Sequence, residues 1–196
     1  MPETPTAPYG SDPYTLAYLD TTPDNGKRHE IIDGVLFVTP APSVNHQRAL
    51  RNLMLTLTKA CPPGPEVLPG PYDYSPTAVR SLQPDLFVLS PDDTNQAYTQ
   101  DPLLVVEIIS PHTGLIDRHL KRQVYQEAGL PSYWIFEPED RVLTVLELQN
   151  GLYTERTFRD DEVFDATRPF PVQIVPAELN QLERGVHSSE PNMLVL

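Results

Sequence analysis

Cysteine, long apolar runs and glycine-rich motifs are scarce in this sequence. The 196-residue chain holds one cysteine, Cys61, which excludes a disulfide scaffold and a cysteine-ligated zinc site. No P-loop or glycine-rich dinucleotide fingerprint occurs among its nine glycines. No apolar run approaches the length of about 18 residues that suggests a transmembrane helix, and residues 1–11 contain no basic residue and no apolar run of a secretory signal. We therefore expect a soluble, cytoplasmic protein with no membrane contact.

Basic residues are also few. Lys and Arg number 14 against 27 Asp and Glu, which gives a formal net charge of −13. Bulk charge of this sign disfavours a polyanion as ligand. The charge is uneven, however: residues 137–196 hold twelve acids and five bases, whereas residues 44–60 hold Arg48, Arg51 and Lys59 and no acid. Binding to DNA is therefore expected to be weak, strongly salt-dependent and reliant on this basic segment and a metal ion.

Prolines, by contrast, are abundant and separate the expected elements. The chain contains 23 of them, and they fall mainly between apolar segments. Residues 1–11 and 185–196 show no periodic apolar face and are expected to be tails, which leaves one domain over 12–184.

The pattern inside the domain predicts a mixed α+β (α/β) fold. Asp33-Gly34 between two apolar segments predicts a hairpin over 29–39, and Ser43 is a suitable N-cap for a helix that extends to residue 60. The other expected elements are a short helix over 11–20, extended segments at 67–68 and 72–74, strands at 85–89, 103–109, 132–136, 142–148 and 152–157, and a helix over 116–128. We expect one central mixed sheet flanked by helices, with an N-terminal hairpin and extra C-terminal strands.

Two carboxylates lie where an apolar strand would bury them. Asp85 opens one apolar run and Glu107 lies within the next. If the two strands are antiparallel with Leu89 opposite Leu103, then Asp85 is also opposite Glu107, on the same face with Cβ atoms about 4.5–5.5 Å apart. Buried carboxylates need an ion pair, hydrogen bonds or a metal ion.

Two explanations of this pair follow from the residues. A cation between the carboxylates would offset their repulsion, and hard oxygen ligands suit Mg²⁺ or Mn²⁺. Alternatively, Asp85 or Glu107 pairs with a nearby arginine such as Arg80. The residues alone leave both explanations open.

The helix over 116–128 supplies cations to the same region. Asp117, Lys121 and Tyr125 are four residues apart and share one face. The neighbouring face, expected to pack on the sheet, consists of Leu120, Val124 and Ala128. Lys121 would then lie at the edge of the buried face, within reach of the preceding strand, although a simple Asp117–Lys121 helix pair also explains the spacing.

Several short motifs occur in order between residues 28 and 137. They are Glu30-Ile31-Ile32-Asp33-Gly34, Pro42-Ser43 with His46, Pro84-Asp85, Val105-Val106-Glu107-Ile108-Ile109-Ser110-Pro111, Asp117 with Lys121, Tyr125, Gly129-Leu130 and Tyr133-Trp134-Ile135. This ordered set resembles the PD-(D/E)XK nuclease superfamily. Within it, the set resembles a bacterial group of restriction-endonuclease-like proteins of unknown function.

The resemblance implies a restriction-endonuclease-like core and a metal-dependent phosphodiesterase. Asp85, Glu107 and the carbonyl of Ile108 would hold Mg²⁺, with Mn²⁺ as a substitute. The superfamily lysine is expected two residues after the glutamate, where this chain has Ile109. In this group the lysine lies on the following helix, a position that Lys121 matches. There it would orient the attacking water and stabilise developing charge.

Further residues complete the predicted site. Glu30 and His46 match positions of the group that this chain resembles, and we count Glu30 with the catalytic residues. The candidate substrate-binding residues are His46, Arg48, Arg51, Arg118 and Tyr125. Tyr133 and Trp134 are expected in the core rather than stacked on bases.

We expect the protein to be a DNA endonuclease. Cutting both strands of a duplex calls for two sites and so favours a homodimer. Two other functions remain open: a catalytically silent binding module on the same fold, and an assembly protein that uses the acidic C-terminal third and the apolar last four residues.

Overall fold

A six-stranded mixed sheet forms the centre of the molecule. The computed structural model describes residues 12–23, 26–90, 101–109 and 114–181. Its strands run in the order β10-β9-β8-β7-β6-β3. Their bounds are β3 Glu66–Pro69, β6 Leu86–Leu89, β7 Leu104–Ile108, β8 Ser132–Glu137, β9 Val142–Gln149 and β10 Leu152–Arg159. The pair β7–β8 is parallel and the other neighbours are antiparallel. The predicted mixed α+β architecture is confirmed.

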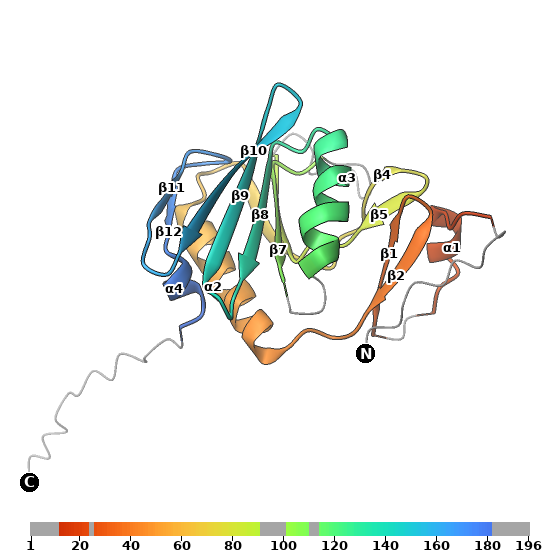
Figure 1. Ribbon diagram of the computed structural model, residues 1–196, viewed down its shortest axis with the longest axis horizontal. Coiled ribbons are helices and arrows are strands. Elements are labelled where there is room, and N and C mark those ends of the chain that lie inside the picture. The colour runs from red at the N-terminus through yellow and green to blue at the C-terminus, as the bar shows by residue number, and fades with distance from the viewer. Residues whose placement is uncertain (1–11, 24–25, 91–100, 110–113, 182–196) are drawn as a thin grey trace, which may run out of the picture.

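Alternate side chains of each strand are buried on opposite faces of this sheet. Because side chains alternate along a strand, Val106 and Trp134 pack on the face covered by α2, whereas Val105 and Tyr133 pack on the face covered by α3 (Figure 1). Trp134 and Tyr133 are fully buried, which confirms that both belong to the core.

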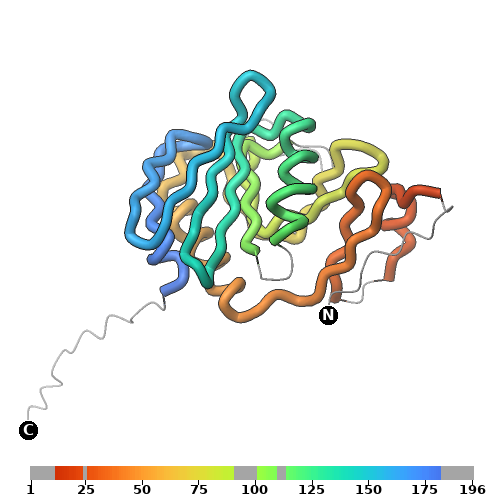
Figure 2. The backbone as a smooth tube through the Cα atoms, in the orientation of Figure 1, coloured from red at the N-terminus to blue at the C-terminus, as the bar shows by residue number. Residues whose placement is uncertain are grey.

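Helix α2 (Val44–Ala60) follows the predicted bounds closely. The Ser43 hydroxyl accepts a hydrogen bond from the His46 amide at 3.2 Å, as expected of an N-cap. Ala49, Leu53 and Leu57 are fully buried and pack on the sheet. The cap therefore fixes His46 in the first turn, where the chain arrives from the N-terminal hairpin (Figure 2).

A second sheet, in the order β2-β1-β5-β4, stands beside the first (Figure 1). Its strands are β1 Arg28–Ile32, β2 Val35–Thr39, β4 Tyr74–Thr77 and β5 Arg80–Leu82. The predicted hairpin is confirmed: Asp33 (φ 50°) and Gly34 (φ 77°) form its turn in the left-handed region. A Cβ at Gly34 would lie 2.6 Å from Cβ of Pro13, so glycine is required there.

Two helices differ from expectation. The first, α1, covers only Leu16–Leu19 and none of its residues is fully buried. The second begins as a π-helix, η2 (Ile116–Lys121), and continues as α3 (Arg122–Glu127). The wider π turn displaces an apolar stripe inferred from the 3.6-residue period. As a result Leu120 is 39% exposed, and the prediction that it packs on the sheet is wrong, while Val124 is buried.

The C-terminal part adds further strands, as predicted. After β10, the strands β11 (Phe164–Ala166) and β12 (Val172–Ile174) pair, and α4 (Pro176–Leu179) packs against α2. No helix in the described part of the chain is long and apolar enough to span a membrane. The two predicted tails, 1–11 and 185–196, lie outside the described residues.

Candidate active site

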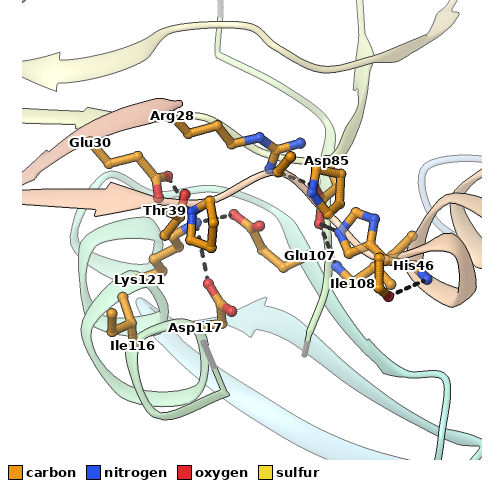
Figure 3. Close-up of a pocket in the computed structure, with 14 residues that line it drawn as sticks. Arg28, Glu30, Thr39, His46, Asp85, Glu107, Ile108, Ile116, Asp117 and Lys121 are labelled. Atoms are coloured by element: carbon orange, nitrogen blue, oxygen red, sulfur yellow. Dashed lines mark hydrogen bonds and ion pairs between the residues drawn. The ribbon is translucent and has the colours of Figure 1, made fainter. Parts of the chain in front are cut away.

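Strands β6 and β7 bring Asp85 and Glu107 together. They are antiparallel, with Leu86 opposite Val106 and Phe87 opposite Val105. Continued by one residue, this register places Asp85 opposite Glu107, so the condition on which the predicted opposition rested is met. Both residues are only 2% exposed. They nevertheless line one cavity, into which both carboxylates point (Figure 3).

The cavity has a volume of about 180 Å³ and lies between the two sheets and the start of α2. The hairpin contributes Arg28, Glu30 and Thr39 to its wall, and η2 contributes Asp117 and Lys121. The segment 40–43 closes it on the side of α2. Segments far apart in the sequence therefore supply its walls.

One ammonium group faces three carboxylates in this cavity. Lys121 Nζ lies 2.8 Å from Glu30 Oε1, 2.9 Å from Glu107 Oε1 and 3.2 Å from Asp117 Oδ1. We call these four residues the Lys121 cluster. Lys121 is 3% exposed and lies deep in the protein, so its predicted position at the edge of the buried face is wrong. Its predicted reach to the preceding strand is confirmed by the contact with Glu107. The Asp117–Lys121 helix pair exists as well, within this larger cluster.

Burial and like charge shift the protonation of this cluster. Burial is the largest influence on the pKa of Glu107 and raises it well above the usual value. Lys121 opposes that shift, whereas Asp117, Asp85 and Glu30 add to it. Burial lowers the pKa of Lys121, but the surrounding carboxylates outweigh burial and hold that pKa well above its usual value. The ammonium therefore stays charged.

A second cluster centres on Asp85. Arg28 Nη1 lies 2.5 Å from Oδ1, while Oδ2 is 3.0 Å from His46 Nε2 and accepts the Ile108 amide at 2.8 Å. We call Asp85, Arg28, His46 and Ile108 the Asp85 cluster. Burial raises the pKa of Asp85, but hydrogen bonds and charge from His46, Arg28 and Ile108 outweigh it, so the pKa lies below its usual value.

Arg28 is the residue that sequence reasoning missed. The alternative of an arginine partner for Asp85 is confirmed, but the arginine is Arg28. Arg80, the expected example, pairs instead with Asp33 (2.6 Å) and Glu127 (2.7 Å). The sequence did hold one signal. Arg28 and Glu30 are two residues apart on β1 and therefore share a face, and Glu30 was already a candidate.

The remaining substrate-binding candidates lie elsewhere. Arg48 Nη1 donates to Asn45 Oδ1 at 2.9 Å and Arg51 donates to Asn52 Oδ1, both on α2 and outside the cavity wall as described. Arg118 pairs with Glu137 and lines a separate cavity. Tyr125 is fully buried and its hydroxyl donates to Glu107 Oε1 at 3.2 Å, so it has no surface to offer a substrate. Of this group only His46 lines the cavity.

The donor set and charge suit a divalent metal ion. The two clusters contain four buried carboxyl groups and two cations, Lys121 and Arg28, which gives a formal charge of −2 when every carboxyl group is counted as ionised and His46 is left out. Over the described residues, no three Asp, Glu, His or Cys side chains form a metal-binding group. Two carboxylates and a backbone carbonyl, with water completing the shell, are typical ligands of Mg²⁺.

Comparison with known proteins places this chain in a family. A family model described as "Putative restriction endonuclease", named Uma2, matches residues 16–180. The chain belongs to the Uma2 family. This membership confirms the resemblance to restriction-endonuclease-like proteins and supports a nuclease-like function. Both clusters lie within the matched residues.

A solved structure has a similar fold. It comes from Anabaena variabilis ATCC 29413 and is described as "a putative nuclease belonging to DUF820". The two chains superpose with a TM-score of 0.68 at 17% sequence identity, over 85% of this chain and 97% of the other. At that identity the likeness establishes the fold. No curated protein matches the sequence.

Proposed function

We propose that this Uma2 protein is a metal-dependent endonuclease that hydrolyses phosphodiester bonds in DNA. The observation that carries the proposal is the opposition of Asp85 and Glu107 across two paired strands, in a cavity with an excess of negative charge. A nuclease needs to neutralise phosphoryl oxygens and to activate a water molecule. A site that lacks positive charge by about two units is suited to a divalent cation that does both.

Asp85, Glu107 and the carbonyl of Ile108 would hold Mg²⁺ or Mn²⁺. When bound, such an ion acts as a Lewis acid and lowers the pKa of its water. His46 and the Ile108 amide fix the orientation of the Asp85 carboxylate through Oδ2. Lys121 and the Tyr125 hydroxyl fix Glu107 through Oε1.

Lys121 is positioned to bind a water molecule or a phosphoryl oxygen. It already faces Glu30, Glu107 and Asp117, and an ammonium has three protons to donate. The contact to Asp117 is the longest of the three, at 3.2 Å, and we propose that a substrate oxygen would replace it. Glu30 has a supporting role, because its Oε1 also accepts the amide of Gln83 at 2.8 Å.

The substrate and assembly follow from the charge and the reaction. Arg48 and Arg51 on α2 lie in the segment with a local excess of positive charge, so we place the DNA backbone there. With a net charge of −13, binding would be weak and would fall steeply with salt. Cleavage of both strands would require two chains, and we propose a homodimer.

A catalytically silent binding module is the second candidate, and one contact favours it. The guanidinium of Arg28 occupies Asp85 Oδ1 at 2.5 Å, where it supplies the positive charge that a metal ion would bring. In such a module, Asp85 and Glu107 would bind no metal ion. The assembly role predicted for the last four residues concerns a segment outside the described part of the chain.

Plasmid cleavage separates these candidates. Supercoiled plasmid is incubated with wild type, Asp85→Ala and Glu107→Ala in Mg²⁺, in Mn²⁺ and in EDTA, and nicked and linear products are measured. We expect cleavage only by wild type and only with metal. Asp161→Ala, which changes an exposed acid, is the matched control and should cleave as wild type does. Equal products from all four proteins would contradict the proposal, because the activity would then be a contaminant.

A further inference from the structure

We propose that Arg28 is a latch on Asp85 that a divalent cation releases, and that the released guanidinium binds the substrate phosphate. The inference rests on the proposed function and identifies a phosphate-binding residue for the same site. It begins from the way in which the two oxygens of Asp85 are shared. Oδ2 is held by His46 and the Ile108 amide, whereas Oδ1 is held by Arg28.

The oxygen held by Arg28 is the one available to a cation. The Ile108 amide belongs to the end of β7 and cannot leave Oδ2 without breaking the strand, and His46 is fixed by the capped first turn of α2. Arg28 is different, because its side chain is 27% exposed and stands at the first residue of β1. A long side chain at a strand end can move with little cost to the backbone.

Electrostatics make the two occupants of Oδ1 exclusive. A guanidinium and a divalent cation at the same carboxylate oxygen would repel each other strongly in a cavity of low dielectric constant. Asp85 therefore exchanges one positive partner for another when the cation binds. Asp85 would thus have a positive partner in both states, and the buried carboxylate would never be left unpaired.

A released guanidinium needs another anion. Glu30 lies two residues along on the same face of β1, but its Oε1 is already engaged by Lys121 and by the amide of Gln83. Arg28 remains in the wall of the cavity that Lys121 and Glu107 also line. Phosphate fits it well, because guanidinium binds two phosphate oxygens in parallel. The cation would thus prepare the site for substrate as it binds.

A Mg²⁺ titration of the wild-type chain followed by NMR tests the release directly, without DNA. The Ile108 amide reports metal binding at Asp85, and the guanidinium resonances of Arg28, assigned with Arg28→Lys, report the latch. Arg80, which pairs with two acids away from the cavity, is the internal control. We expect the Ile108 and Arg28 signals to shift together with one saturation curve, while those of Arg80 stay in place.

The outcomes separate the latch from the proposed function. If Ile108 shifts and Arg28 does not, the latch is overturned and the metal site stands. If Ile108 does not shift at millimolar Mg²⁺, no cation reaches Asp85, and the proposed function fails together with the inference drawn from it.

Two variants measure the exchange and its consequence. Arg28→Met should bind Mn²⁺, followed by electron paramagnetic resonance, at least about fivefold more tightly than wild type, whereas Arg80→Met should match wild type. With Ca²⁺ present, Arg28→Met should lose at least about fivefold in affinity for a fluorescein-labelled DNA duplex. Unchanged Mn²⁺ affinity would overturn the latch, and unchanged duplex affinity would overturn the role in phosphate binding. Circular dichroism of both variants is measured alongside, and each is expected to match the wild-type spectrum.

Discussion

In the Lys121 cluster one ammonium faces three carboxylates, whereas in the Asp85 cluster one carboxylate accepts from a guanidinium, an imidazole and a backbone amide. In the first cluster, burial and the neighbouring carboxylates outweigh the single ammonium, so the pKa of Glu107 is raised. The second has many donors around one acid, so the pKa of Asp85 is lowered. Adjacent groups in one cavity can therefore be tuned in opposite directions by the partners that surround them.

The clusters also differ in their access to the cavity opening. The side chains of Lys121, Glu30 and Glu107 are each at most 4% exposed, whereas Arg28 is 27% exposed. Removing one partner from a fully buried ionic cluster leaves an uncompensated charge that water cannot reach. The Lys121 cluster should therefore matter most for stability, and the Asp85 cluster for exchange of ligands.

The largest effect is expected from Lys121→Met. This change keeps most of the side-chain volume but leaves three buried carboxylates without their ammonium. We expect a loss of about 3–5 kcal/mol in the free energy of unfolding, measured by urea denaturation in EDTA. Lys59→Met, in the exposed last turn of α2, is the control and should change stability by less than about 0.5 kcal/mol. Similar losses of stability in both variants would contradict the claim that burial makes Lys121 more important for stability than an exposed lysine.

A smaller loss is expected from Asp85→Asn. The amide keeps the shape of the carboxylate and can still accept from Ile108, but it removes the charge that Arg28 pairs with. A loss of about 1.5–3 kcal/mol in the same assay would match a hydrogen-bonded charged group. Asp33→Asn is the paired control, because its ion pair with Arg80 is exposed at the aspartate and should be worth about 0–1 kcal/mol. Equal losses in the two variants would show that burial does not increase the contribution of the Asp85 ion pair to the free energy of unfolding.

The pH dependence of stability should have opposite signs in the two clusters. Because the folded-state pKa of Asp85 is lowered, its contribution is present above the unfolded value of about 3.9 and is lost as pH falls through the folded value. The folded-state pKa of Glu107 is raised, so stability decreases as pH rises from about 4.3 toward that value.

Urea unfolding in EDTA across the acid range measures both dependences. The destabilisation caused by Asp85→Asn should disappear at low pH. Glu107→Gln should abolish the decrease in the free energy of unfolding that accompanies rising pH. Each slope is limited to about 1.4 kcal/mol per pH unit for one proton. The same sign in both variants would refute the difference between the clusters.

The smallest effect is expected from Ser43→Ala. The Ser43 hydroxyl accepts the amide of His46, so this change loosens the first turn that carries the imidazole. We expect a loss of about 1 kcal/mol and a shift of the Ile108 amide resonance, because Ile108 and His46 share Asp85 Oδ2. Ser43→Asn retains a capping oxygen and should restore both. An Ile108 signal that is unchanged in Ser43→Ala would show that the cap does not help to position the residues of the Asp85 cluster.

Local pattern accounts for most of the elements that were predicted correctly. The Asp33-Gly34 turn, the helix capped by Ser43 and the strand pair around Phe87 and Val105 each follow from residues close in sequence. The register of that pair was a condition of the prediction, which the structure confirms; alternation excludes a one-residue slip but allows a slip by two residues. The π turn before α3 did not follow, since no local pattern distinguishes it from an α-helix.

The sequence by itself determined that Asp85 and Glu107 lie at or within apolar strands and that Lys121 follows on the next helix, because apolar runs and helical spacing are local properties of the chain. That the two carboxylates lie opposite each other depended on a strand register that only the structure supplied. Only the tertiary structure decided what surrounds them. Arg28 lies 57 residues before Asp85, on a different sheet, and its contact depends on how the two sheets meet. The depth of Lys121 likewise depends on Glu30 arriving from the hairpin. Ion pairs of this kind are set by packing between elements, for which sequence spacing carries no information.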